Sequence, residues 1–155
     1  MADQKVYFMQ HGLAVDKADD PERPLSKAGI VQTEKIADTL RASGTVITSV
    51  FHSGKLRAAQ TAEIISNILV TPDVSRADGL SPNDDVTLLA QDLKVNNVLY
   101  IGHLPHLEKL VTHLVASNAK KDTIKFKNSA VVCLTKQENN YFIDWYLTPD
   151  TLITD

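Results

Sequence analysis

The sequence has very little cysteine, which limits how the chain is stabilised. Cys133 is the only cysteine among 155 residues, so no disulfide forms within the chain. Disulfides are rare in reducing compartments, and the cytoplasm is therefore the expected location. Because Cys133 lies within an apolar segment, we expect it to be a small buried hydrophobic residue.

Long hydrophobic runs and a surplus of positive charge are also missing. No apolar stretch approaches the roughly 20 residues that span a bilayer. The first residues, Met-Ala-Asp-Gln-Lys, lack the basic start and apolar run of a signal peptide. The net charge is −3 and the pI is near 5.9, whereas a general nucleic-acid binder is usually basic. We therefore expect neither a membrane nor a nucleic acid among its partners.

The remaining composition is that of an ordinary globular protein. Hydrophobic residues make up 43% and charged residues 23% of the chain, and the length suits one domain with a buried core. No repeat, low-complexity tract or Gly/Ser-rich linker divides the sequence. We therefore expect a single domain over residues 1–155.

Hydrophobic patterning predicts strands that alternate with helices. Ser26 is expected to cap a helix that ends at Gly44, with Ile30 and Thr33 on its buried face together with Ala37 and Leu40. Further helices are predicted over residues 58–69, over residues 86–93 after a loop with Pro72 and Pro82, and from Pro105 onward. The expected strands cover residues 5–9, 46–51, 98–101, 130–134 and 141–146, the last two as a hairpin.

This alternation predicts an α/β fold: a three-layer α/β/α sandwich with a mainly parallel central sheet. In such sheets, ligands bind at the carboxyl ends of the strands. Two histidines and an arginine would converge there. The three predicted strand ends are followed by Gln10-His11-Gly12, by His52-Ser53-Gly54 leading to Arg57, and by Gly102-His103.

These residue types suit the binding and transfer of a phosphoryl group. The guanidinium of Arg57 carries a permanent charge and a planar fork of donors that fits a phosphate dianion. A histidine can act as a nucleophile and divide a displacement into phosphorylation and hydrolysis. The two histidines then need different protonation states, a neutral nucleophile and a partner whose charged form the bound phosphate favours.

The other histidines have simpler interpretations. His52, His106 and His113 are expected to be non-catalytic, with His106 the closest of them to the predicted pocket. The segment from His103 to His106 also admits a metal site, but no second ligand pair has a recognisable spacing. We therefore expect neither a metal nor another cofactor.

The motifs together resemble the histidine phosphatase superfamily, in particular its small phosphohistidine phosphatases of the SixA type. The resemblance covers residues 6 to about 110, extends weakly over residues 126–134 and implies a phosphoglycerate mutase-like fold. The matching motifs are Gln10-His11-Gly12, then Arg23-Pro24-Leu25-Ser26 with Gly29, then Ser53, Arg57, Gln60 and Thr61, then Leu80-Ser81-Pro82, and finally Gly102-His103-Leu104-Pro105.

The resemblance implies roles for these residues. His11 would be the phosphorylated nucleophile, and Arg23 and Ser53 would lie along the approach of the substrate. The phosphate pocket would comprise Gln10, His11, Arg57, His103 and Leu104, and the catalytic set would be His11, Arg57 and His103.

The sequence departs from the family pattern in two places. Gln10 stands where the family carries an arginine, so one charged donor is missing. Larger members also carry an acidic proton donor on an inserted segment, and no residue here is an evident equivalent. Asp78, Asp84 and Asp85 are the candidates.

The function predicted is a metal-independent phosphohistidine phosphatase. Its partner would be a protein with a phosphorylated histidine, such as a phosphotransfer domain or a phosphocarrier, and phosphate or another oxyanion would fill the pocket. Two alternatives remain. The same site would serve a phosphatase of small phosphate esters, or Gln10 would have turned it into a phosphate- or phosphoprotein-binding module with reduced turnover.

Overall fold

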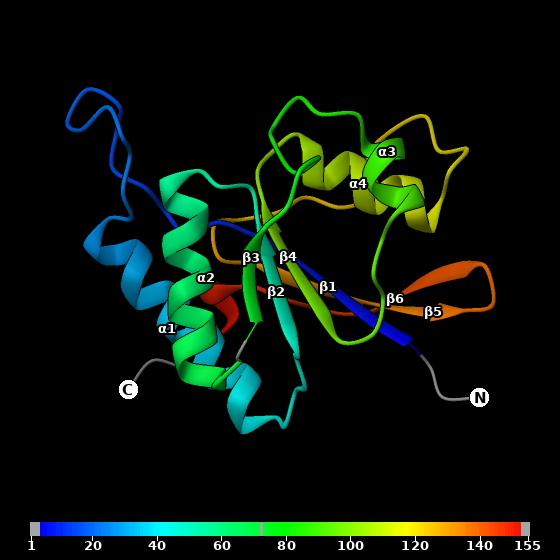
Figure 1. Cartoon of the computed structure of the whole chain (residues 1–155), viewed down its shortest axis with the longest axis horizontal. Coiled ribbons are helices and arrows are strands. Elements are labelled where there is room, and N and C mark those ends of the chain that lie inside the picture. Colours follow the sequence, from blue (N-terminus) through cyan, green and yellow to red (C-terminus); the bar gives the residue numbers. More distant parts are fainter. Residues whose placement is uncertain (1–3, 72, 153–155) are drawn as a thin grey trace.

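The computed structural model describes residues 4–71 and 73–152, which form alternating strands and helices (Figure 1). The strands are β1 (Gln4–Gln10), β2 (Ser49–His52), β3 (Asp73–Arg76), β4 (Val98–Gly102), β5 (Val131–Gln137) and β6 (Asn140–Leu147). The helices are α1 (Lys27–Ala42), α2 (Leu56–Leu69), α3 (Val86–Gln91) and α4 (His106–Val115), followed by the short 3₁₀ turn η1 (Pro149–Thr151).

All six strands form one mixed sheet in the order β3-β2-β4-β1-β5-β6. The first four are mutually parallel, whereas β5 is antiparallel to both β1 and β6. The expectation of a mainly parallel sheet was therefore wrong. The antiparallel direction of β5 follows from the loop after α4. This loop brings the chain back at the carboxyl end of β1, where Val131 pairs with Met9. From that end β5 has to run against β1, and the predicted hairpin then adds β6 antiparallel to β5.

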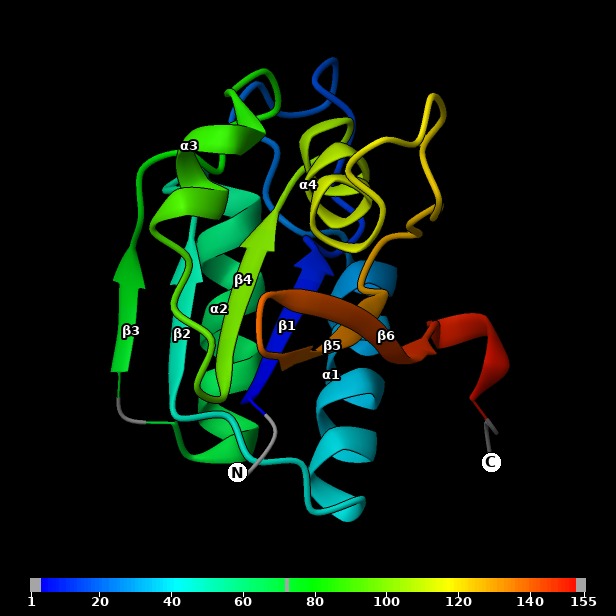
Figure 2. The same cartoon turned by 90° about the vertical axis from the view of Figure 1, so that its right-hand side faces the viewer.

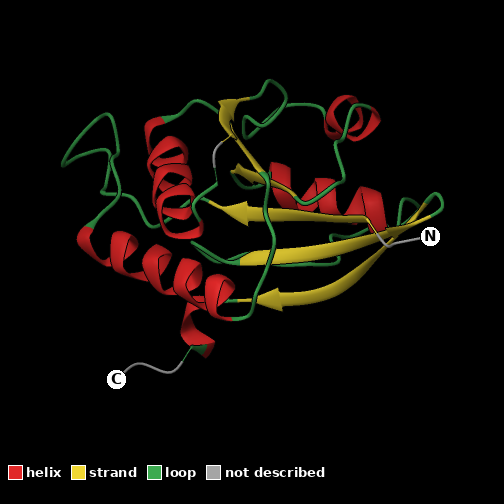
Figure 3. Ribbon diagram, turned by 60° about the horizontal axis from the view of Figure 1, so that its bottom comes forward, coloured by secondary structure: helices red, strands yellow, loops and turns green. Residues whose placement is uncertain are grey.

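Helices cover both faces of the sheet (Figures 2 and 3). Helices α1 and α2 pack on one face, and α3 and α4 pack on the other. Consecutive side chains of a strand point to opposite faces, so β1 serves both cores. Tyr7 and Met9 join the core under α1 and α2, while Val6 and Phe8 join the core under α3 and α4.

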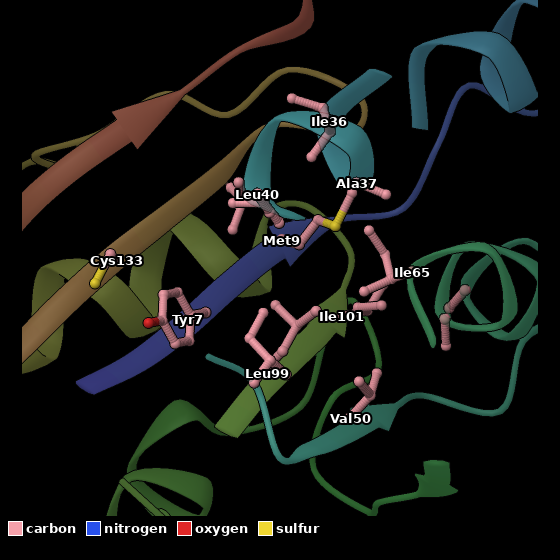
Figure 4. Packing of buried hydrophobic residues seen from close by; sticks show 14 residues of the cluster. Tyr7, Met9, Ile36, Ala37, Leu40, Val50, Ile65, Leu99, Ile101 and Cys133 are labelled. Carbon is pink, nitrogen blue, oxygen red and sulfur yellow. The ribbon is translucent and has the colours of Figure 1, made fainter. Parts of the chain in front are cut away.

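The core under α1 and α2 is well filled by apolar side chains (Figure 4). Met9 and Ile101, from the neighbouring strands β1 and β4, lie against Ile36 of α1 and Ile65 of α2. Cys133 of β5 is buried in the same cluster as a free cysteine, as its apolar segment indicated. Burial of its thiol raises its pKa to about 11, so the thiol is uncharged near neutral pH.

The predicted start of the first helix is confirmed, and one of its face residues was wrong. The hydroxyl of Ser26 caps α1 by accepting a hydrogen bond from the N–H of Gly29 at 3.0 Å. Thr33 is fully buried, but Ile30 is 40% exposed. Ile36, which the sequence pattern did not select, takes a core position in α1. The buried face of α1 therefore includes Ile36 and leaves Ile30 toward solvent.

Strand β3 was not predicted, since residues 73–76 were included in a loop. All four of its residues are exposed. Strand β3 is an outermost strand of the sheet and pairs with β2. An exposed edge strand has no buried face, so it lacks the apolar alternation that identifies a strand. Pro72, expected in the same loop, lies outside the described residues. Among the residues the structure describes, no helix has both the length and the apolar character to cross a membrane.

Candidate functional site

Three strand ends meet at one edge of the sheet, as the sequence predicted. Strand β4 lies between β1 and β2 and is parallel to both, so the three carboxyl ends are side by side. Gln10 at the end of β1 is paired with Gly102 at the end of β4. The residues that follow, His11 and His103, therefore leave neighbouring strands at the same level, with their ring centroids 4.9 Å apart.

His11 is held as a neutral imidazole in a defined tautomer. Its ring is 7% exposed, and its Nδ1 lies 2.7 Å from the carbonyl oxygen of Gly12. A carbonyl oxygen only accepts hydrogen bonds, so Nδ1 carries the proton. Burial lowers the pKa of His11 to about 4, and the charges of Arg57 and Arg23 act in the same direction. Near neutral pH the lone pair is therefore on Nε2, where a nucleophile needs it.

His103 is buried more deeply and is hydrogen-bonded to the loop after β2. Its ring is 1% exposed, and its Nε2 lies 2.6 Å from Oγ of Ser53. Burial lowers its pKa to about 3, with further contributions from His11 and Arg57. Nδ1 is buried and has no hydrogen-bond partner in the described part of the chain. Near neutral pH both imidazoles are therefore neutral, and a bound dianion would favour their charged forms.

Two further polar groups at this edge are buried without partners. Nε of Arg57 and Oε1 of Gln10 make no hydrogen bond to any residue that the structure describes. Buried polar groups are nearly always hydrogen-bonded, and an exception needs an explanation. An oxyanion would satisfy the guanidinium of Arg57, which lies in the first turn of α2. Leu104, also assigned to the pocket from the sequence, is half-buried directly after His103.

The two residues expected on the approach differ in their surroundings. Ser53 is 8% exposed and contacts His103 directly, so it lies deeper than an approach residue would. Arg23 is half-buried in the loop between β1 and α1, where its Nε donates a hydrogen bond to the carbonyl of Val15 at 3.2 Å. The charge of Arg23 affects the pKa of both His11 and Arg57, which places it close to both.

The motif that includes Arg57 also contains Gln60 and Thr61, whose side chains join the loops of the site to α2. Oγ1 of Thr61 accepts a hydrogen bond from the N–H of Gly12 at 2.9 Å and donates one to the carbonyl of Arg57 at 2.7 Å. Oε1 of Gln60 accepts from the N–H of Leu25 at 2.7 Å. These two side chains of α2 therefore hold the segment after His11, at Gly12 and at Leu25, against the helix that carries Arg57.

Residues before β5 complete the support of His11, and the sequence analysis did not find them. Nδ2 of Asn128 donates to the carbonyl of His11 at 3.3 Å. The hydroxyl of Ser129 is hydrogen-bonded to that of Thr33 at 2.8 Å. A Cβ on Gly12 would lie 2.7 Å from Oγ1 of Thr33, so this close contact requires glycine. The weak resemblance over residues 126–134 assigned no role to Asn128 or Ser129, which lie more than 100 residues from His11 along the chain.

The other three histidines, His52, His106 and His113, do not form part of the His11–His103 pair. Nδ1 of His52 accepts a hydrogen bond from the N–H of Gly54 and so shapes the loop after β2. His106 is buried at the start of α4, and His113 is half-buried near the end of the same helix. Residues 4–71 and 73–152 contain no group of three or more histidine, cysteine or acidic side chains that could hold a metal ion.

The three candidate acids lie beside Ser53. Asp78, Asp84 and Asp85 line a cavity of about 330 Å³ that also includes Ser53. Asp84 accepts a hydrogen bond from the N–H of Ser81, and Asp85 caps α3 by accepting from the N–H of Thr87. Both carboxylates therefore have structural partners on their own loop.

The described chain combines a mixed α/β sheet with two imidazoles and the half-buried Arg57 at the carboxyl ends of its parallel strands, an arrangement typical of the histidine phosphatase class. Known proteins agree with this assignment, although no family model matches the chain. The phosphohistidine phosphatase SixA of Escherichia coli is 34% identical over 158 residues, covering 96% of each chain. The chain belongs to the SixA family of phosphohistidine phosphatases, as the motifs indicated.

Solved structures share the fold over nearly the whole chain. A protein histidine phosphatase SixA complexed with tungstate has 31% sequence identity and a TM-score of 0.85, over 95% of this chain and 98% of that one. A candidate SixA phosphohistidine phosphatase from Agrobacterium tumefaciens has 22% identity and a TM-score of 0.77, over 96% and 100% of the two chains. The second likeness concerns the fold alone.

Proposed function

We propose that residues 1–155 act as one histidine phosphatase domain that hydrolyses phosphohistidine on a protein partner through a phosphorylated His11. The observation that carries this proposal is the state of His11. Its Nδ1–H is engaged by the carbonyl of Gly12, its pKa is lowered to about 4, and the charge of Arg57, whose Nε is buried without a partner among the described residues, acts on it directly. Family membership supports the substrate class, because the relative from Escherichia coli is a phosphohistidine phosphatase.

The reaction then takes two displacements at phosphorus. Nε2 of His11 attacks the phosphoryl group, and the bond between phosphorus and the imidazole nitrogen of the substrate breaks. The leaving imidazole takes a proton from solvent. Water next attacks phospho-His11 and loses a proton, so that inorganic phosphate and neutral His11 are released. Arg57 stabilises the charge on the transferring oxygens in both steps, and the phosphoryl group favours a protonated His103 that donates from Nδ1.

The leaving group explains why phosphohistidine suits this site. An alkyl phosphate departs as an alkoxide, which a positioned acid has to protonate. The conjugate acid of an imidazole has a pKa of about 6.5, so solvent protonates the leaving nitrogen near neutral pH. Asp84 and Asp85 are engaged on their own loop. A site in which two of the three candidate acids are already engaged by their own loop favours cleavage of a phosphorus–nitrogen bond.

The experiment that tests the proposal compares leaving groups. We expect kcat/KM for phosphohistidine to exceed that for simple alkyl phosphates at least ~100-fold, or about 2.7 kcal/mol in transition-state free energy. p-Nitrophenyl phosphate should fall between them, because phenolate leaves more readily than alkoxide. Release of phosphate is measured for free phosphohistidine, a phosphohistidine protein, p-nitrophenyl phosphate and an alkyl phosphate at one pH. A ranking with alkyl phosphates first would contradict the proposal and imply a working general acid.

Gln10 gives a second prediction, about phosphate affinity. An arginine in its place would add a charged donor beside a dianion, and one such hydrogen bond is worth about 1.5–3 kcal/mol. We expect Gln10→Arg to bind inorganic phosphate about 10- to 200-fold more tightly in calorimetric titrations. Turnover need not rise, since tighter binding of the released phosphate slows its departure.

The matched control for this change is Gln10→Met, which keeps the length of the side chain and removes its polar amide group. We expect it to bind phosphate more weakly than the parent protein. Thermal unfolding checks that both variants are folded. If a folded Gln10→Arg protein binds phosphate no more tightly than the parent, the pocket does not simply lack one positive charge.

A further inference from the structure

The depth of the site sets a condition on whatever delivers the phosphoryl group. His11 and His103 are 7% and 1% exposed, and Gln10 is 8% exposed. A phosphorylated histidine has to extend its ring into this site, so the backbone that carries it comes against the surrounding surface. The residues at the edge of the site are therefore in a position to contact a protein substrate.

Three exposed leucines, each from a different segment, adjoin residues of the site in the chain or share a cavity with one of them. Leu13 follows Gly12 directly and is 39% exposed, and Leu56 precedes Arg57 directly and is 38% exposed. Leu88 of α3 is 63% exposed and lines the same cavity as Ser53, the partner of His103. We call these three residues the leucine rim. The segments that carry them lie at the end of the molecule to which the arrows of β1, β2 and β4 point (Figure 2).

Positive charges lie close to the site at the start of α2 and at Arg23, whereas Asp78, Asp84 and Asp85 line the cavity that contains Leu88. Lys55 is exposed at the start of α2, and its charge helps to lower the pKa of His103. Arg23 acts in the same way on His11. Leu56 thus lies between two cations, Lys55 and Arg57. A complementary surface has apolar side chains facing the leucines and carboxylates facing the lysine and arginine.

We propose that the leucine rim is the docking surface for the protein substrate, and that this partner presents its phosphohistidine from an apolar face with acidic residues on the side that meets Lys55 and Arg23. The inference rests on the proposed function and adds the surface that selects the partner. A small phosphate ester would be enclosed by the pocket and would not reach the leucines, so contact with the rim separates a protein substrate from a metabolite.

The test compares two substrates that share a leaving group and differ in size. The probes are a histidine-containing phosphotransfer domain, phosphorylated with phosphoramidate, and free phosphohistidine. The variants are Leu13→Ser and Leu56→Ser, singly and together. The control is Val46→Ser, because Val46 is 57% exposed and precedes β2, at the opposite end of that strand from the site. Circular dichroism and thermal unfolding check the fold of each protein.

We expect the double variant to lose at least ~10-fold in kcat/KM on the phosphorylated domain and to stay within about twofold on free phosphohistidine, because a few central apolar residues carry most interface energy. Val46→Ser should match the parent protein on both. Equal losses on both substrates, or no loss on the domain, would overturn the docking surface. A parent protein that hydrolyses free phosphohistidine but not the domain would also overturn it. If the parent hydrolyses neither, the proposed function itself fails.

Discussion

Replacement of His11 by alanine is expected to lower phosphohistidine hydrolysis at least about 1,000-fold while leaving the chain folded. The proposed mechanism routes every turnover through a bond between phosphorus and Nε2 of His11, and loss of a covalent nucleophile has effects of this size or larger. Within the described residues the His11 side chain is hydrogen-bonded to the carbonyl of Gly12, a contact that the fold does not need. His103 is not positioned to replace it, because its Nε2 is engaged by Ser53.

Two measurements check this expectation. Single-turnover hydrolysis is followed for the variant and the parent, and labelled phosphate is trapped on denatured protein, where only the parent should carry a label. His113→Ala is the matched control, since it removes a half-buried imidazole that lies near the end of α4. A folded His11→Ala protein that retains even a tenth of the parent rate would show that the covalent route is wrong.

Replacement of Arg57 by alanine is expected to lower kcat/KM by about 100- to 1,000-fold, the usual loss when one preorganised donor to a developing oxyanion is removed. Nε of Arg57 is buried without a partner in the described chain, so the guanidinium is available to the ligand. The same change should weaken inhibition by tungstate, the oxyanion found in the structure of a SixA relative. Activity and the inhibition constant are both measured.

Arg57→Lys separates charge from geometry in this experiment. Lysine keeps the positive charge but loses the planar fork, so its activity should lie between those of alanine and arginine. Arg41→Ala is the control, because Arg41 is an exposed arginine in the last turn of α1. Inhibition by tungstate that is unchanged in Arg57→Ala would remove this residue from the pocket.

The positions of the strands with buried faces followed from the sequence, and so did the grouping of the site residues. Apolar runs that end in Gln10-His11-Gly12 and in Gly102-His103 identify β1 and β4, because a strand buried on both faces has few polar residues. The rule that sites form at the carboxyl ends of the strands of an α/β sheet then places His11, Arg57 and His103 together. The motif around Arg57 was recognised from the spacing of Ser53, Arg57, Gln60 and Thr61 in the sequence.

Tertiary structure decided what local pattern does not encode. The direction of β5 depends on where the loop after α4 returns to the sheet, and β3 is an exposed edge strand with no apolar signature. Asn128 supports His11 from a distant part of the sequence. The sequence determines which side chains can do the chemistry. Burial fixes their protonation, because only the assembled fold removes the water that would keep the pKa of His11 near its ordinary value.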